Sequence, residues 1–190
     1  MGWNDVGYHG SKIATPHIDR LVKDGMQLDR FYVHPICSPT RAALMTGRLP
    51  VRFGITAALT RGAGVSKDEH FMPQTFQKAG YQTFLVGKWH LGANYPFRPQ
   101  DRGFQESVWY PSSSIPSVPA YWGNDYFDDV YVHNGKEKQF KGYCTDVFFN
   151  EAKRFISESA QKKNPFLCYI ATNTPHGPFW PKEEDRKAIA

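Results

Sequence analysis

The fold of this chain is decided by residues 73–92, which read PQTFQKAGYQTFLVGKWHLG. Residues 73–79 are predicted to form a helix, because proline suits a first helical position and Gly80 can end the helix. Residues 81–86 follow as a predicted strand, and residues 87–92 as a loop with unusual polar side chains. A helix, a strand and a polar loop in this order are typical of an α/β protein.

Helices and strands alternate along the rest of the chain as well. Thr15-Pro16 and Ser38-Pro39 mark two helix starts, and Gly25 and Gly47 mark the ends of those helices. The other predicted elements are a strand at residues 26–33, a hairpin of Tyr131–His133 and Lys136–Lys138 around the turn Asn134-Gly135, a helix capped by Thr145, a strand at Phe166–Ala171, and a helix that begins at residues 182–187. This alternation predicts an α/β fold whose sheet is largely parallel and flanked by helices.

Composition excludes several classes of protein. With 41% hydrophobic residues, 14 Phe, 10 Tyr and 5 Trp, the chain can bury a core, so disorder is excluded. Its longest purely apolar run is Phe166–Ala171, too short to cross a bilayer. The first residues also lack the basic and then apolar pattern of a signal peptide. We therefore expect neither a signal peptide nor a membrane partner.

The net charge of +5 is placed unevenly. Residues 1–100 hold 12 basic and 6 acidic residues, whereas residues 101–190 hold 11 and 12. Because the basic residues are scattered singly, a nucleic-acid partner is not expected, whereas a small anion or a merely solvated surface would both fit this pattern.

Three cysteines, Cys37, Cys144 and Cys168, lack any C-x-x-C spacing. This pattern argues against a zinc site or a disulfide scaffold, and at most one pair could form a bridge. Cys168 lies inside an apolar run and is predicted to be a buried core thiol.

Three of the predicted strands are each followed by a loop with unusual polar residues. Because the carboxyl ends of parallel strands share one edge of a sheet, these loops are expected to form one pocket. The five residues expected to converge there are Cys37 and Arg41 from the first loop, Lys88 and His90 from the second, and His176 from the third.

The residue types in this set fit one chemistry. Cys37 lies at a helix N-terminus, where free N–H groups favour an anion, and Arg41 lies one turn further on the same helix face. Lys88 and His90 point to the same side of an extended segment. Two cations, two imidazoles and a helix N-terminus describe a site for a tetrahedral oxyanion such as sulfate or phosphate.

Two thiol-based enzyme classes fit less well. Cysteine phosphatases place five residues between their Cys and Arg, whereas three lie between Cys37 and Arg41. A cysteine protease would need an Asn or Asp that orients a histidine, and nothing marks such a partner. The remaining histidines are interpreted as surface or packing residues: His9, His17, His34, His70 and His133.

Residues 93–128 show little periodicity and predict a long ordered loop of the kind that often shapes a substrate pocket. Its aromatic residues would suit stacking on a sugar or aryl ring, and they would equally suit a core. They are Tyr95, Trp109, Tyr110, Tyr121, Trp122 and Tyr126.

Two long motifs resemble the signatures of one enzyme family. Residues 37–48, CSPTRAALMTGR, are similar to the C-x-P-x-R signature of type I sulfatases with its T-G-R segment. Residues 87–92, GKWHLG, are similar to the second signature. Residues 2–8 and 15–21 resemble the opening of arylsulfatases, including the galactosamine-4-sulfatase branch. The resemblance covers essentially the whole chain and places it in the alkaline phosphatase superfamily.

The resemblance implies a fold and a mechanism. Residues 1–190 would be part of an N-terminal catalytic domain with an alkaline-phosphatase-like, mixed and largely parallel sheet. A separate formylglycine-generating enzyme would oxidise Cys37 to formylglycine, whose hydrated aldehyde attacks the sulfur of a sulfate ester and later expels sulfate. Arg41 would hold the formylglycine and His90 would assist elimination. Lys88 and His176 would bind sulfate oxygens, and His176 would suit protonation of the leaving alcohol.

The family also implies a calcium or magnesium ion bound to formylglycine at position 37 and to carboxylates. The carboxylates are normally an Asp-Asp pair before the segment that starts at Met1 and an Asp-Asn pair well after residue 190. We therefore expect a fragment, without the apolar first strand and the C-terminal part, that does not hydrolyse an aryl sulfate by itself. Family members are often periplasmic, secreted or lysosomal.

Two other functions remain open at this point. The chain could be a non-catalytic remnant that keeps an anion pocket, or a phosphodiesterase or phosphonate hydrolase of the same superfamily. Aryl and carbohydrate sulfates both suit the expected site, and the sequence does not distinguish between them.

Overall fold

The computed structural model describes residues 1–60, 62–115 and 125–189. The chain forms two compact units, residues 1–33 and residues 34–190. The sequence-based division, a single partial domain over residues 1–190, stays a prediction. Among the described residues, no helix combines the length and the apolar character that a bilayer crossing requires.

The first unit contains two short 3-10 helices, Trp3–Asp5 and Gly7–His9, and the helix α1, Pro16–Asp24. Helix α1 starts after Thr15 and ends before Gly25, as predicted. The Thr15 hydroxyl, however, does not cap α1. It accepts the Gly7 amide at 2.7 Å and donates to the Asp19 carboxylate at 2.8 Å, so it ties the 3-10 helices to α1.

The predicted strand at residues 26–33 is wrong. These residues form no strand, and Leu28–Phe31 makes a turn in which the Phe31 amide donates to the Leu28 carbonyl. Met26 and Tyr32 are 84% and 85% exposed. An apolar segment becomes a strand only when another strand satisfies its backbone groups, and no described strand pairs with this one.

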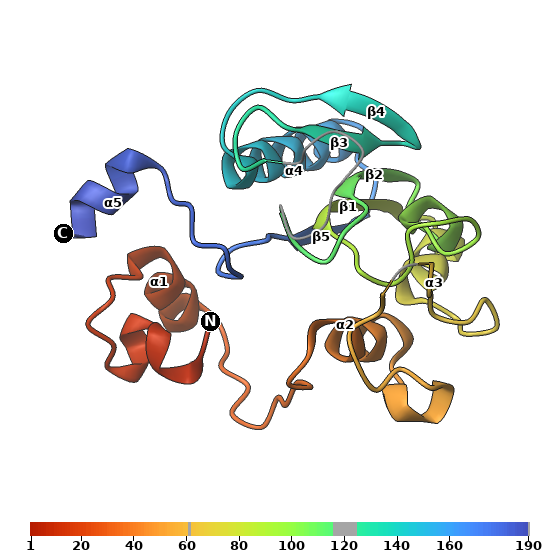
Figure 1. The fold of residues 1–190 in the computed structure, drawn as a ribbon, viewed down its shortest axis with the longest axis horizontal. Helices are drawn as coiled ribbons and strands as arrows, with labels where there is room; N and C mark the ends of the chain where they lie inside the picture. The colour runs from red at the N-terminus through yellow and green to blue at the C-terminus, as the bar shows by residue number, and fades with distance from the viewer. Residues whose placement is uncertain (61, 116–124, 190) are drawn as a thin grey trace. The chain divides into compact units, whose positions relative to one another are not determined.

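The second unit is built around a sheet with helices on both faces (Figure 1). Its elements are α2 (Cys37–Thr46), a 3-10 helix (Pro50–Phe53), α3 (Met72–Lys78), β1 (Gln82–Lys88), a 3-10 helix (Pro99–Arg102), β2 (Glu106–Tyr110), β3 (Val130–His133), β4 (Lys136–Gln139), α4 (Cys144–Gln161), β5 (Phe166–Ala171) and α5 (Glu183–Ile189).

The described strands form one sheet in the order β4-β3-β2-β1-β5. Strand β1 is parallel to both β2 and β5, whereas β2 with β3 and β3 with β4 are antiparallel. The predicted mixed α/β sheet flanked by helices is therefore confirmed. The predicted hairpin turn is also present, because Asn134 and Gly135 both have the positive φ that a type I′ turn requires.

Alternate residues of β1 enter two separate cores. Phe84 and Val86 pack against Phe148 and Phe155 of α4 on one face. Leu85 packs on the other face with residues of α2, α3 and the following loop. Helix α4 begins at Cys144 after Tyr143, so Thr145 lies inside the helix and does not cap it, contrary to the prediction. Cys168 is half-buried against the α4 core, and burial raises the pKa of its thiol to about 11.

Residues 93–128 were predicted to be a long loop, and this prediction is wrong in its middle. Strand β2 lies there, fully within the sheet, and both Trp109 and Tyr110 are buried. Tyr126 is buried as well, whereas Tyr95 is 76% exposed. Tyr121 and Trp122 fall outside the described residues. Trp109, Tyr110 and Tyr126 therefore belong to the cores rather than to a sugar-stacking surface.

Gly87 allows β1 and β5 to approach closely beside the predicted site. It has a φ of +99°, and a Cβ added there would lie 2.1 Å from the carbonyl oxygen of Ala171, its register partner. Any larger residue would push the two strands apart. Glycine at this position thus keeps the carboxyl ends of β1 and β5 together.

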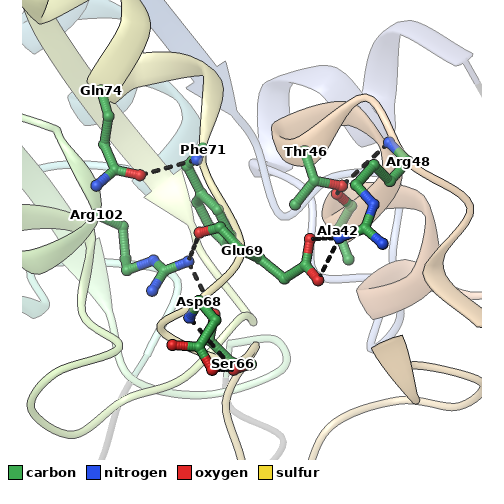
Figure 2. A network of polar contacts seen from close by, with 9 residues as sticks. All are labelled: Ala42, Thr46, Arg48, Ser66, Asp68, Glu69, Phe71, Gln74 and Arg102. Atoms are coloured by element: carbon green, nitrogen blue, oxygen red, sulfur yellow. Dashed lines mark hydrogen bonds and ion pairs between the residues drawn. The ribbon is translucent and has the colours of Figure 1, made fainter. Parts of the chain in front are cut away.

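A polar network anchors the end of α2 opposite Cys37 (Figure 2). Gly47 ends α2 with a φ of +66°, and Arg48 then donates to both carboxylate oxygens of Glu69 at 2.6 and 2.5 Å. Arg102, which is 3% exposed, donates to the carbonyls of Ser66 and Glu69, and its guanidinium lies 4.0 Å from the centre of the Phe71 ring.

Candidate functional site

The predicted site lies at the carboxyl ends of β1 and β5, next to the N-terminus of α2. Lys88 is the last residue of β1, His90 follows two residues later, and His176 lies in the loop after β5. Cys37 is the first residue of α2. Two of the three loops thus follow parallel strands as predicted, whereas the Cys37 loop does not follow a strand.

Arg41 holds α2 against the sheet. Its Nη1 donates to the carbonyl oxygen of Lys88 at 2.9 Å and to the hydroxyl of Tyr169 on β5 at 3.2 Å. Cys37, Arg41 and Tyr169 line a pocket of about 290 Å³. His34, interpreted from the sequence as a surface or packing residue, lines the same pocket.

Lys88 is buried beside a second cation. Its ammonium interacts electrostatically with the Cys37 side chain, and the residue is only 3% exposed. Burial, and then the positive charge of Arg41, lower the pKa of Lys88 below 10.5. None of the ion pairs among the described residues includes Arg41 or Lys88. The site therefore keeps an uncompensated positive potential.

His90 is held in a defined orientation. Its Nε2 donates to the carbonyl oxygen of Leu59 at 3.0 Å, and its Nδ1 is buried without a hydrogen-bond partner among the described residues. Burial, and then the positive charge of Lys88, lower the pKa of His90 to about 4. The imidazole is therefore neutral at physiological pH, with its lone pair on Nδ1.

His176 is exposed but lies within electrostatic reach of His90. Its Nδ1 lies 2.6 Å from the Gly177 carbonyl oxygen, which can only accept, so Nδ1 carries a proton and Nε2 is the second nitrogen left to interact. The five predicted residues are thus linked by contacts or electrostatic interactions, and their catalytic and binding roles stay predictions.

Three residues of the site were missed in the sequence. Tyr169 contacts Arg41 from β5, and Ser38 and Leu59 hydrogen-bond to His90. Tyr169 could have been found as a polar aromatic residue in a strand that ends at the site. Leu59 acts through its backbone carbonyl, so its side chain carries no signal.

The described residues do not by themselves assemble a metal site, and the role of position 37 as a metal ligand stays a prediction. Residues 1–60, 62–115 and 125–189 contain no group of three or more His, Cys, Asp or Glu side chains that could hold a metal ion. A calcium or magnesium ion needs several oxygen ligands, mostly carboxylates, and these residues do not gather such a set around Cys37.

Comparisons with known proteins agree with the geometry. A family model described as Sulfatase matches residues 1–188. The chain belongs to the sulfatase family. Sulfatases use a formylglycine and a divalent metal in general. The position of Cys37 beside Arg41 and Lys88 suits the first of these groups.

Related sulfatases include an N-acetylgalactosamine-6-sulfatase of Mus musculus, which is 34% identical over 95% of this chain and 39% of its own length. The chain thus spans about two fifths of that relative. The crystal structure of Ps i-CgsB in complex with k-i-k-neocarrahexaose is 34% identical, with a TM-score of 0.90 over 99% of this chain and 46% of that one. BT4656, solved in complex with its substrate D-glucosamine-2-N,6-O-disulfate, is 29% identical, with a TM-score of 0.75 over 94% of this chain and 33% of that one.

Proposed function

We propose that this chain provides the nucleophile and the sulfate-binding cations of a sulfuric ester hydrolase. The observation that carries the proposal is the cluster of Cys37, Arg41 and Lys88, in which two cations surround the thiol and no carboxylate of the described residues pairs with either. A sulfate ester spreads its negative charge over several oxygens. Donors and cations that are already fixed in place bind such an anion with little reorganisation.

The two cations have different tasks in this proposal. Arg41 uses Nη1 to bond Lys88 and Tyr169, so Nε and Nη2 remain for the group at position 37. The Lys88 ammonium interacts electrostatically with the same group and suits binding of a sulfate oxygen beside it. Free N–H groups at the first turn of α2 add to the attraction for an anion.

The two histidines suit opposite proton transfers. His90 is neutral, with an unprotonated and unpartnered Nδ1, which can accept a proton from a hydroxyl in the site. His176 is exposed and lies within electrostatic reach of His90, so its Nε2 suits donation of a proton to the leaving alcohol. In this proposal the pair supplies a base and an acid for one ester.

We further propose that Cys37 is converted to formylglycine by a separate maturation enzyme. When present, formylglycine supplies through its hydrated aldehyde the hydroxyl that attacks sulfur. The half-buried position of Cys37 at the start of α2, in a pocket shared with Arg41, supports this proposal. A divalent metal is not part of the proposed role of this chain's own residues.

The proposed substrates are sulfated carbohydrates. The support comes from BT4656, whose substrate is D-glucosamine-2-N,6-O-disulfate, and from the relatives named N-acetylgalactosamine-6-sulfatase. The pocket at Cys37, about 290 Å³, can admit a sulfate group and part of a sugar ring.

Mass spectrometry of the chain co-expressed with a formylglycine-generating enzyme tests the proposal directly. The peptide with residue 37 should become lighter by about 18 Da, the difference between cysteine and formylglycine. Cys168 serves as the internal control, because its thiol should keep its mass. An intact Cys37 thiol after co-expression would overturn the proposed nucleophile.

Anion titration tests the binding half of the proposal without any turnover. Sulfate should perturb the resonances of Lys88 and His90 at lower concentration than chloride does. A preference for phosphate esters over sulfate esters would instead favour the phosphodiesterase or phosphonate hydrolase class. Sulfate binding by a chain whose Cys37 is never converted would favour a non-catalytic remnant.

A further inference from the structure

Ser38 lies at the centre of a closed ring of hydrogen bonds around His90. The residue is fully buried in the first turn of α2, directly after Cys37. Its hydroxyl donates to the carbonyl oxygen of His90 at 3.0 Å and accepts the amide of Leu59 at 3.0 Å. The Leu59 carbonyl in turn accepts the His90 Nε2 proton at 3.0 Å. Three residues from three segments thus form a ring.

The ring determines which nitrogen of His90 carries the proton. A carbonyl oxygen can only accept, so the Leu59 carbonyl selects the tautomer with the proton on Nε2. Nδ1 then holds a lone pair, and it is buried without a partner among the described residues. The nitrogen of His90 that keeps an unused lone pair is therefore Nδ1.

The same ring supports an uncommon backbone conformation. His90 has a φ of +60°, in the left-handed region that a residue with a Cβ adopts at a cost. The bond from Ser38 to the His90 carbonyl restrains the peptide group that follows this φ. Strain held by surrounding contacts at a candidate site is consistent with a functional requirement for the conformation.

We propose that Ser38 is a positioning residue that acts through the Leu59 peptide and fixes the tautomer and orientation of His90, with Nδ1 as the proton acceptor of the site. This inference rests on the proposed function for its role in the reaction. In that role, one proton moves from a hydroxyl to His90 Nδ1, while Nε2 keeps its own proton on the Leu59 carbonyl. Ser38 itself does not touch the substrate.

A purely structural role for Ser38 makes a different prediction. If the hydroxyl only satisfied buried backbone groups, its removal would lower the stability of the fold and leave the His90 tautomer unchanged. If Ser38 positions the ring, its removal frees the Leu59 peptide to rotate, and the two tautomers of His90 become mixed. The state of the two His90 nitrogens separates these alternatives.

The experiment is two-bond proton–nitrogen NMR of the full chain labelled with ¹⁵N-histidine, with His90→Gln used to assign the signal. At neutral pH the wild-type chain should show a protonated Nε2 and an unprotonated Nδ1 for His90. Ser38→Ala should produce a clear population with protonated Nδ1, and Ser38→Thr should restore the wild-type pattern. Thr46→Val, which removes another hydroxyl bonded within α2, is the matched control and should change nothing at His90.

Two results would overturn the inference. A wild-type His90 with its proton on Nδ1 would do so even if Ser38→Ala failed to fold. If the Ser38→Ala chain folds and His90 keeps its proton on Nε2, the role of Ser38 is purely structural and the inference is wrong. Both readouts are independent of turnover, so a failure of the proposed hydrolase activity would leave this test intact. In a complete enzyme that hydrolyses a sulfate ester, Ser38→Ala should lower kcat with little change in KM.

Discussion

Helix α2 connects two arginine sites that differ in whether a carboxylate pairs with the arginine. Arg48, just after its end, donates to both oxygens of the Glu69 carboxylate, and Arg102 caps backbone carbonyls of the same segment (Figure 2). Arg41, in its second turn, donates hydrogen bonds only to a carbonyl and a hydroxyl among the described residues, and lies beside Lys88. We call the first group, Arg48, Glu69 and Arg102, the closed network, and the second, Cys37, Arg41, Lys88 and His90, the open cluster.

The difference shows how one helix can serve stability at one end and binding at the other. In the closed network a carboxylate neutralises Arg48, and Arg102 donates through Nη2 to two backbone carbonyls, while its Nε has no partner among the described residues. In the open cluster two cations remain uncompensated, and the Nδ1 of His90 has no partner among the described residues. Unsatisfied groups lower stability, and they persist where a ligand can satisfy them. The open cluster is therefore expected to respond to substitution differently from the closed network.

The largest effect is expected from Arg102 in the closed network. Arg102→Met keeps the apolar stem but leaves the carbonyls of Ser66 and Glu69 without their donor and removes the cation over Phe71. The free energy of unfolding should fall by about 3 kcal/mol. Urea denaturation at neutral pH measures it.

Arg98→Met is the matched control for this prediction. Arg98 lies next to the same 3-10 helix and pairs with Asp101, but its side chain is 35% exposed. Arg98→Met should lower the free energy of unfolding by less than about 1 kcal/mol, because water can replace the Arg98 guanidinium at the Asp101 carboxylate. Equal losses for the two variants would show that Arg102 is no more important to the fold than a surface arginine.

The sequence predicted the elements whose signals are local. Phe166–Ala171 is an apolar run between Pro165 and Thr172, and its bounds were predicted correctly. Strand β2 was missed because Glu106 and Ser107 make it look polar, although Ser107 is fully buried. Residues 26–33 show the reverse error, since an apolar pattern cannot indicate whether another strand is present to pair with it.

As with the fold, the sequence predicted only part of the candidate site. Cys37, Arg41 and Lys88 lie in two motifs. The parallel arrangement of β1 and β5 brings the loops of Lys88 and His176 to one edge of the sheet as expected, whereas the loop before Cys37 follows no strand. Side-chain patterns could not reveal the Leu59 carbonyl, since every residue has one. The uncompensated positive charge of the cluster could not be predicted from the sequence either, because it depends on which carboxylates lie near Arg41 and Lys88 in the folded chain.

An acid-induced loss of stability should come from the open cluster. The pKa of His90 is lowered from 6.5 to about 4, so between these pH values the unfolded chain binds a proton that the folded chain does not. The stability contributed by neutral His90 is therefore complete above pH 6.5 and is lost as the pH falls toward 4. The full shift corresponds to roughly 3 kcal/mol, and solvent screening of the partly exposed ring reduces the expected loss to about 2 kcal/mol. Urea denaturation across this pH range measures the loss.

His90→Gln should flatten this part of the profile, because glutamine does not titrate and can still donate to the Leu59 carbonyl. His70→Gln, at an exposed histidine, controls for the substitution itself. A profile that is equally steep in wild type and His90→Gln would place the acid sensitivity elsewhere in the chain.

The smallest expected change in stability has the opposite sign and tests the comparison most directly. Lys88 is buried beside Arg41, and its pKa lies below 10.5, so the folded chain holds this proton less tightly than the unfolded chain does. Stability therefore rises as the pH increases from the lowered pKa toward 10.5, and at neutral pH the charged Lys88 destabilises the fold. Lys88→Met should stabilise the chain by about 1 kcal/mol at neutral pH, measured by urea denaturation.

The same substitution should weaken binding of inorganic sulfate at least about tenfold in a calorimetric titration, because the anion loses one of its two cations. Lys141→Met, at an exposed lysine, removes the same net charge and should leave both quantities almost unchanged. Stabilisation together with lost affinity is the signature of a charge kept for a ligand. If Lys88→Met instead destabilised the chain and left sulfate binding intact, Lys88 would serve the fold as Arg48 and Arg102 do, and the contrast between the two ends of α2 would not hold.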